Sequence, residues 1–407
     1  MSDSNDLNET KILITATTFP LDKNDSQPRF ILNLAQSLQK YFNVQVLVPR
    51  GDGAVKKEVF EGVKVERFAY FFKSLESLVY GGGILENLKK SKLNYLQVPF
   101  LFLAQFISLC RVIKRDKISI VNAHWIVPQG VIAIITKKLF FKQLKVVVTS
   151  HGADLFSLRS NLLTKLKKWV IESSDCFIVV SEAMKEFCYE EVGVCKSKNI
   201  LVRSMGVDLS SKFTIQKPLE QREGIIFVGR LAEKKGLHVL IDAIALLKTN
   251  YPDISLTVVG DGPEKESLIK RSQKLKVDTN IKFLGSRQNQ EIPALLNQHK
   301  IFVMPSIVAK SGDQEGLGLV AVEALGCGCA VIASDLPAVR DVITDNENGY
   351  LFETGNEKSL VQKLELLLTD DKEVTRFVKT GTATAKMKFD WQNVGKDYSH
   401  YLSRIVN

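Results

Sequence analysis

The stretch that decides the fold is Glu315-Gly-Leu-Gly-Leu-Val-Ala-Val-Glu323, which runs through Ala-Leu-Gly-Cys-Gly into the apolar segment Ala330-Val-Ile-Ala-Ser334. Small residues between two acids predict a helix start near Leu317, and the apolar segment predicts a buried strand. The first amides of such a helix, those of Gly318 to Val320, have no partner within the helix and can hold a phosphate. Glu323, about five residues into such a helix, would lie roughly 7–8 Å from its start along the axis. The two acids therefore suit a sugar and a ribose on either side of a diphosphate.

A second motif lies upstream, in Gly224-Ile-Ile-Phe-Val-Gly-Arg230-Leu-Ala-Glu-Lys-Lys235-Gly236. It predicts a buried strand, a tight turn that carries cations, and a helix that opens at Gly236. The Arg230 guanidinium offers a planar fork to phosphate oxygens, and Lys235 adds a mobile point charge. This pair can neutralise a nucleoside diphosphate leaving group without a metal ion. Lys234, in the same turn, fits a solvated basic residue.

A histidine follows a third apolar segment. His151-Gly152-Ala153-Asp154 comes directly after Val146-Val-Val-Thr-Ser150, at the carboxyl end of a predicted parallel strand. Ligands of open α/β sheets collect at this edge, which favours a site role for His151. Asp154 is equally compatible with a place in the site and with capping a helix.

Apolar segments rich in Val and Ile alternate with helical segments along the whole chain, which is typical of parallel βαβ units. A chain of 407 residues suits two domains better than one core. We therefore expect an α/β protein of two Rossmann-like domains facing a central cleft. The predicted strands are Lys11–Thr17, Val44–Val48, Val63–Phe68, Ile118–Ala123, Lys145–Ser150, Cys176–Ser181, Ile200–Val202, Ile225–Val228, Leu256–Val259, Ile281–Leu284, Ile301–Met304 and Ala330–Ala333. The predicted helices are Phe30–Lys40, Leu96–Lys114, Gln129–Lys138, Leu162–Ser173, Glu182–Tyr189 and Trp391–Ile405.

These motifs together resemble the retaining nucleotide-sugar glycosyltransferases of family 4, which have the GT-B architecture. The resemblance spans nearly the whole chain and is strongest from Gly224 to Gly349. It implies that Glu315 contacts the donor sugar, that Glu323 binds the ribose, and that Arg230 and Lys235 contact the diphosphate. It also places His151 close to the reacting centre. The remaining donor-binding positions that it suggests are Gly316, Gly318, Leu319 and Val320.

The polar stretch Lys212–Glu223 indicates an interdomain linker, and together with the resemblance it sets the expected domain limits. They are an acceptor-side domain at residues 1–212, a nucleotide-sugar-binding domain at 213–388, and a helix at 389–407 that crosses back to the first domain. The loop Thr17–Arg29 departs from many relatives because it contains no glycine. A subset of exopolysaccharide transferases has a similar loop and a segment like Asn122-Ala-His124-Trp125. The departure affects the identity of the acceptor more than that of the donor.

The net positive charge of the chain is confined to its first half. Residues 1–215 contain 30 Lys and Arg against 20 Asp and Glu, so the whole net charge of +10 lies there. Basic clusters such as Lys89-Lys90-Ser-Lys92 stand beside Leu, Phe and Trp, a mixture that suits anionic lipid head groups. A solvated basic face is the alternative, and no nucleic-acid-binding module accompanies the charge. The apolar segment Val98–Cys110 is short and interrupted by Gln105 and Ser108, so we expect a buried helix there.

The sequence thus predicts a retaining glycosyltransferase that moves a hexose from a nucleoside diphosphate sugar to a lipid-linked glycan in polysaccharide biosynthesis. The amino terminus has no signal-peptide pattern, so we expect a cytoplasmic protein peripherally bound to the inner face of the plasma membrane. No metal or other cofactor is expected, because an Asp-x-Asp motif and a Walker A motif are both absent. A sugar-nucleotide 2-epimerase and a non-catalytic nucleotide-sugar binder are the alternatives. The donor base and sugar, the acceptor and the oligomeric state stay open.

Overall fold

The computed structural model describes residues 10–406, except 24, 26–28 and 158–159. The chain forms two compact units. The first contains the chain up to Val180, Met184–Arg203 and the chain from Val394 onward; the second contains Ser181–Ala183 and Ser204–Asn393. The change from first to second unit falls at Ser204, earlier than the boundary predicted at residue 213. The return falls at Val394, later than the one predicted at residue 389.

The first unit is built on an eight-stranded sheet with the order β3-β4-β2-β1-β5-β6-β7-β8. All its strand pairs are parallel except β3 with β4. The strands are β1 (Lys11–Thr15), β2 (Asn43–Pro49), β3 (Lys57–Phe60), β4 (Val63–Phe68), β5 (Ile120–His124), β6 (Lys145–Ser150), β7 (Cys176–Val179) and β8 (Ile200–Val202). The chain builds outward from β1 first on one side and then on the other, so the strand order reverses between β1 and β5. Such a reversal is where open α/β sheets place their ligands.

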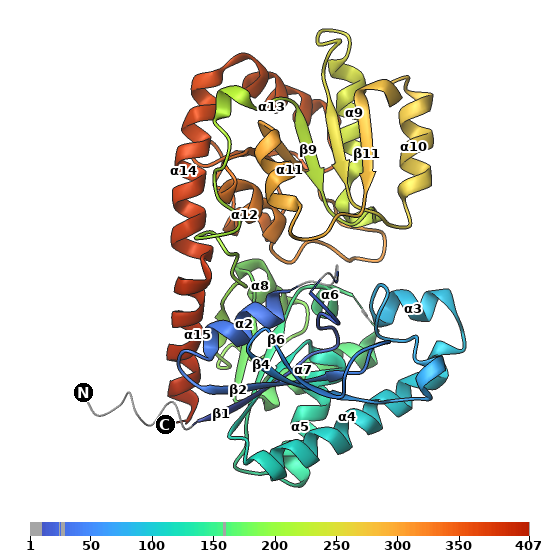
Figure 1. Ribbon diagram of the computed structural model, residues 1–407, viewed down its shortest axis with the longest axis vertical. Helices are drawn as coiled ribbons and strands as arrows, with labels where there is room; N and C mark the ends of the chain where they lie inside the picture. Colours follow the sequence, from blue (N-terminus) through green and yellow to red (C-terminus); the bar gives the residue numbers. More distant parts are fainter. Residues whose placement is uncertain (1–9, 24, 26–28, 158–159, 407) are drawn as a thin grey trace, which may run out of the picture. The chain divides into compact units, whose positions relative to one another are not determined.

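Helices connect these strands. They are α2 (Phe30–Leu38), α3 (Ile84–Lys90), α4 (Asn94–Asp116), η2 (Ile126–Gly130), α5 (Val131–Leu139), α6 (Ala153–Phe156), α7 (Asn161–Ser173) and α8 (Glu182–Glu190), with a 3₁₀ turn η1 (Lys73–Leu75). α4 and α5 lie together on one side of the sheet (Figure 1). Only 33% of the most apolar 18-residue window of α4 is buried, so the prediction of a buried helix was wrong.

The second unit has a six-stranded parallel sheet with the order β11-β10-β9-β12-β13-β14. Its strands are β9 (Ile225–Val228), β10 (Leu256–Val259), β11 (Ile281–Gly285), β12 (Ile301–Met304), β13 (Ala330–Ser334) and β14 (Tyr350–Phe352). Its helices and turns are η3 (Leu219–Gln221), η4 (Glu233–Lys235), α9 (Leu237–Leu247), α10 (Lys265–Lys274), η5 (Asp278–Asn280), α11 (Ile292–Gln298), α12 (Leu319–Gly326), η6 (Val339–Asp341), α13 (Glu357–Thr369) and α14 (Asp371–Phe389). The last helix, α15 (Trp391–Val406), begins in this unit and continues into the first. The strand order reverses between β9 and β12, so the loops after these two strands meet at one point of the sheet edge.

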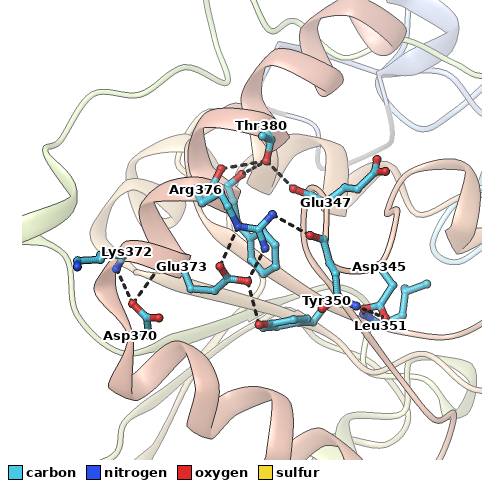
Figure 2. A network of polar contacts seen from close by, with 11 residues as sticks. Asp345, Glu347, Tyr350, Leu351, Asp370, Lys372, Glu373, Arg376 and Thr380 are labelled. Atoms are coloured by element: carbon cyan, nitrogen blue, oxygen red, sulfur yellow. Dashed lines mark hydrogen bonds and ion pairs between the residues drawn. The ribbon is translucent and has the colours of Figure 1, made fainter.

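Polar contacts fasten α14 to the edge strand β14. The Tyr350 hydroxyl donates to Glu373, whose carboxylate also accepts from Arg376. Arg376 donates in turn to the carbonyl of Asn346, and Thr380 donates to that of Glu347. Figure 2 shows this network between the helix and the turn before β14. From Val394 onward the following helix α15 belongs to the first unit, where Tyr401 accepts a hydrogen bond from Arg203.

The predicted α/β class is confirmed, since each unit is built on its own sheet of mainly parallel strands. Two strands were missed, β3 and β14, and both lie at the edge of their sheet. The predicted helix at 129–138 is divided into η2 and α5.

Candidate active site

The turn after β9 positions the two predicted diphosphate contacts. Arg230 lies two residues beyond the end of the strand and is exposed, and Lys235 closes η4. Gly236 then adopts φ 61°, and a Cβ there would lie 1.9 Å from the Pro305 carbonyl oxygen. Only glycine fits this close approach, because the backbone after β12 passes directly against it. The turn after β9 and the loop after β12 therefore pack directly against each other.

Further contacts hold the loop after β12 against this turn. The Ile307 amide donates to the Lys234 carbonyl at 2.8 Å, and the Lys310 amide donates to Glu233 at 3.1 Å. Lys234 forms an ion pair with Asp313 at 3.1 Å. Lys234 is therefore a structural tether, where the sequence predicted only a solvated basic residue.

Lys235 and Glu315, which the sequence predicts to serve diphosphate and sugar, are in direct contact. The Lys235 ammonium lies 2.5 Å from a Glu315 carboxylate oxygen, and the two side chains are only 17% and 13% exposed. Burial by itself raises the pKa of Glu315, but Lys235, Lys234 and the Gly316 amide together hold that pKa below its ordinary value. Glu315 is therefore a charged acceptor at neutral pH, and Lys235 is its counter-ion.

The helix start lies two residues later than predicted. α12 begins at Leu319, and Gly318 is its N-cap with φ 95°. A Cβ at Gly318 would also lie 2.8 Å from the Met304 side chain, so this position needs glycine. The Ala321 amide bonds the Gly318 carbonyl. Leu319 and Val320 are the first two residues of the helix, so their amides are the ones placed to bind a phosphate. Gly316 and Leu317 are buried in the loop before the helix.

Glu323 lies one turn into α12, the helix that begins four residues after Glu315. Burial raises its pKa to about 7, against a weaker opposite effect of Lys212. A carboxylate with a pKa this high gains stability from hydroxyl donors such as those of a ribose, because they favour its charged form.

Two glycines follow β10, in the stretch Val259-Gly-Asp-Gly-Pro, and both lie directly against the backbone after β9. A Cβ at Gly260 would lie 1.9 Å from the Gly229 oxygen, and one at Gly262 would lie 2.3 Å from the Leu231 oxygen. Both glycines therefore serve the close packing of the loops after β9 and β10, and the loop after β10 supports the turn that carries Arg230.

The first unit places His151 in a compact aromatic cluster. His151 follows β6, and its ring lies 2.8 Å from the ring of His124, the last residue of β5. Phe30 and Trp125 complete the surroundings, with ring centroids 4.8 and 5.2 Å from that of His151. Burial lowers the pKa of His151 to about 3, so the imidazole is neutral at physiological pH. His151 can act by hydrogen bonding but not as a cation.

The contact with His124 selects the tautomer of His151. The Nε2 atom of His124 is buried and has no hydrogen-bond partner. Buried N–H groups without a partner are rarer than bare acceptors, so we place the proton of His124 on Nδ1. That Nδ1–H then donates to Nε2 of His151, which leaves the proton of His151 on Nδ1. The sequence marked His124 only as part of a segment, because nothing in it shows that β5 and β6 are neighbours.

Asp154 holds the histidine loop in place. Its carboxylate accepts hydrogen bonds from the Ser150 hydroxyl at 2.9 Å and from the amides of His151 and Ile126 at 3.1 and 2.8 Å. All these partners belong to the two strand ends that carry the histidines. The N-cap of α6 is Gly152, so Asp154 does not cap that helix. Its contacts instead position the loop that carries His151.

Two family models together match most of the chain. Residues 27–211 match the family described as Glycosyltransferase Family 4, and residues 211–384 match that of glycosyl transferases group 1. N-acetyl-alpha-D-glucosaminyl L-malate synthase of Bacillus anthracis is 24% identical over 72% of this chain and 76% of its own length. The amylovoran biosynthesis glycosyltransferase AmsK of Erwinia amylovora is 27% identical over 68% of each chain.

A solved structure has the same fold over its full length. The Anabaena protein HepE, crystallised with UDP and glucose, superposes with a TM-score of 0.73 at 18% identity, over 97% of this chain and all of that one. Two family descriptions that adjoin at residue 211, together with the GT-B fold, identify this chain as a glycosyltransferase of family 4.

Proposed function

We propose that this glycosyltransferase transfers a hexose, with retention, from a nucleoside diphosphate sugar to a lipid-linked glycan in polysaccharide biosynthesis. The observation that carries the proposal is the junction of the loops after β9 and β12. It brings Arg230, Lys235, Glu315 and the start of α12 to the strand-order reversal of one sheet. A diphosphate and its sugar need cations, free amides and an acceptor for hydroxyls, and this junction supplies all three.

In the proposed mechanism, Arg230, Lys235 and the amides of Leu319 and Val320 stabilise the negative charge that develops as the diphosphate leaves. Glu315 accepts hydrogen bonds from sugar hydroxyls, and Glu323 accepts them from the ribose. In the first unit, His151 offers a neutral Nδ1–H as a hydrogen-bond donor. The acceptor attacks from the face that the diphosphate leaves, and a phosphate oxygen takes the acceptor's proton, so no metal ion is required.

The relatives support parts of this assignment. HepE was crystallised with UDP and glucose, which favours a uridine nucleotide as donor. AmsK is named for amylovoran biosynthesis, which favours a polysaccharide acceptor. The Bacillus relative is named for a malate product, so a small soluble acceptor is the alternative to test. The net positive charge of residues 1–215 favours a cytoplasmic enzyme held at the inner face of the plasma membrane.

A donor screen tests the proposal. UDP-, GDP- and ADP-hexoses are compared by thermal shift, since a ligand at 100 times its dissociation constant stabilises by about 2.7 kcal/mol. The stabilising donor is then incubated with lipid-linked and soluble glycans, and NMR identifies the anomeric configuration of the product. A product of inverted configuration would contradict retention. Conversion of the donor to its 2-epimer without transfer, or binding without turnover, would refute the transferase assignment.

A further inference from the structure

Helix α4 of the first unit exposes a row of large apolar side chains. Leu96, Phe100, Leu103 and Ile107 follow one another at spacings of three and four residues, which places them on one face of the helix. Their exposed fractions are 62%, 50%, 57% and 46%. A helix of a soluble protein ordinarily turns such a row toward its core. Here the row faces outward.

The opposite face of α4 buries polar side chains. The Gln97 amide accepts a hydrogen bond from the Ser77 amide at 3.2 Å and donates one to the Ser77 hydroxyl at 3.0 Å. Gln105 is fully buried and reaches Thr15 of β1. By length and composition α4 could cross a membrane. Crossing would separate these glutamines from their partners in the fold, so the contacts favour a helix that stays on its unit.

Aromatic residues extend the apolar surface beyond α4. Phe71 packs on Phe100 and on Phe72 with centroid distances of 5.2 Å in both cases, and Phe72 is 72% exposed. Phe140, which follows α5, lies 5.9 Å from Phe106 of α4. We call the exposed row of α4, together with Phe72 and Phe140, the α4 face.

The chain segment that carries α4 is rich in cations. The helical spacing of the row continues from Ile107 to Arg111 and Lys114, so these two exposed cations lie on the same side. Residues 87–153 contain eleven Lys and Arg against a single acidic residue, Asp116. A second copy of this chain would bring cations opposite cations in a two-fold interface. An anionic bilayer would accept both the apolar row and its basic surroundings.

We infer that the α4 face docks on an anionic bilayer, with the helix axis in the plane of the membrane. Leu96, Phe100, Leu103 and Ile107 enter the boundary between head groups and acyl chains, while Arg111 and Lys114 contact anionic head groups. The inference deepens the proposed function, since it names the surface through which a transferase acting on lipid-linked glycans would reach them.

Vesicle sedimentation without donor or acceptor tests the inference independently of the transferase assignment. We expect the wild-type protein to bind vesicles of phosphatidylcholine with phosphatidylglycerol and to bind pure phosphatidylcholine less. Changing Phe100, Leu103 and Ile107 together to Ser should lower the partition coefficient at least about tenfold, because the inserted apolar area is lost. Arg111→Gln with Lys114→Gln should lower binding about fivefold per cation and reduce its salt dependence.

Two controls keep the test specific. Leu246→Ser with Leu366→Ser removes apolar residues of matched exposure, 47% and 46%, from the second unit and should leave vesicle binding unchanged. Phe100→Trp keeps the surface apolar, and its added fluorescence should shift to shorter wavelength with vesicles and be quenched by brominated lipids. The inference is overturned if wild-type protein ignores anionic vesicles at low salt, or if the triple Ser variant, shown folded by circular dichroism, binds as well as wild type. A wild-type dimer that the triple variant dissociates, without vesicle binding, would instead show a second copy on this face.

Discussion

Replacing Lys235 separates the contribution of its ion pair with Glu315 to stability from the contribution of Lys235 to catalysis. Lys235→Met removes the charge but keeps the apolar stem, so Glu315 loses its counter-ion while staying largely buried. Breaking a fully buried pair costs about 3–5 kcal/mol, whereas an exposed pair contributes about 0–1 kcal/mol. At 2.5 Å and with 17% and 13% exposure, the pair lies between these limits. We expect Lys235→Met to lower the free energy of unfolding of the second unit by about 2 kcal/mol at pH 8.

The pH dependence of this loss has a definite sign. In the wild type the pKa of Glu315 is held low, so its contribution to stability is present above the ordinary glutamate pKa and is lost as pH falls through the folded value. In Lys235→Met the burial of Glu315 acts with much less opposition and raises that pKa. The variant should therefore approach wild-type stability toward pH 5 and fall behind it toward pH 8.

A double-variant cycle completes the test. Adding Glu315→Gln to Lys235→Met removes the uncompensated charge, so the double variant should lose clearly less stability than the two single losses added together. Urea unfolding followed through Trp391 in the second unit measures this, with the exposed Lys274→Met as control. Turnover should behave differently: Lys235→Met should lower it about 10²-fold or more, and the double variant should not recover it. Additive stability losses, or a loss equal at pH 5 and pH 8, would refute the assigned ion pair.

Three further predictions concern the remaining site residues. Arg230→Ala should lower turnover at saturating donor by about 10²-fold while weakening donor affinity less. Unchanged turnover would show that Arg230 does not stabilise the leaving diphosphate. Glu323→Gln should mainly raise the donor KM. The same variant should also change stability, because burial raises the pKa of Glu323 in the folded wild type to about 7. Ionising Glu323 therefore lowers the stability of the wild type, by an amount that grows as pH rises from the ordinary glutamate pKa to about 7. The variant should thus be more stable than wild type above pH 7 and equal to it near pH 4.5, as thermal melts at both pH values will show. His124→Leu should lower turnover and change the tautomer of His151 in ¹⁵N-edited NMR spectra, while His124→Asn, which keeps a donor at the same place, should preserve both.

The strands that the sequence predicts best are those buried on both faces. Val146, Val147 and Val148 of β6 are fully buried, so they form a continuous apolar run that is visible without any alignment. The missed strands β3 and β14 lie at sheet edges. In β3 only Phe60 is buried, and Val59 points outward among charged residues, so no apolar pattern marks it. Edge strands are recognised through the neighbour that pairs with them, which a single sequence does not reveal.

The candidate site could be predicted as residue types but not as contacts. The spacing of Glu315 and Glu323 and the basic turn after β9 are local patterns, and the sequence is sufficient for them. The contact between Lys235 and Glu315 joins residues 80 positions apart. It exists because β12 pairs directly with β9, although two strands lie between them in the sequence. Hydropathy likewise marked α4 as apolar, but an average over a helix carries no information on which face is buried.

The charge balance of the second unit's site suggests why Glu315 needs its counter-ion before a donor arrives. Arg230, Lys234 and Lys235 supply three positive charges, and Glu315 and Asp313 supply two negative ones, so the five side chains carry one net positive charge. A nucleoside diphosphate adds about two negative charges, against which the start of α12 contributes roughly half a positive charge. With all three cations charged, the balance on binding is therefore about half a negative charge. Lys235 must then be shared between Glu315 and the diphosphate, so donor binding weakens the hold of Lys235 on Glu315 and raises the pKa of that carboxyl. The bound donor consequently makes Glu315 a stronger acceptor for sugar hydroxyls at the moment when the departing phosphate draws Lys235 toward itself.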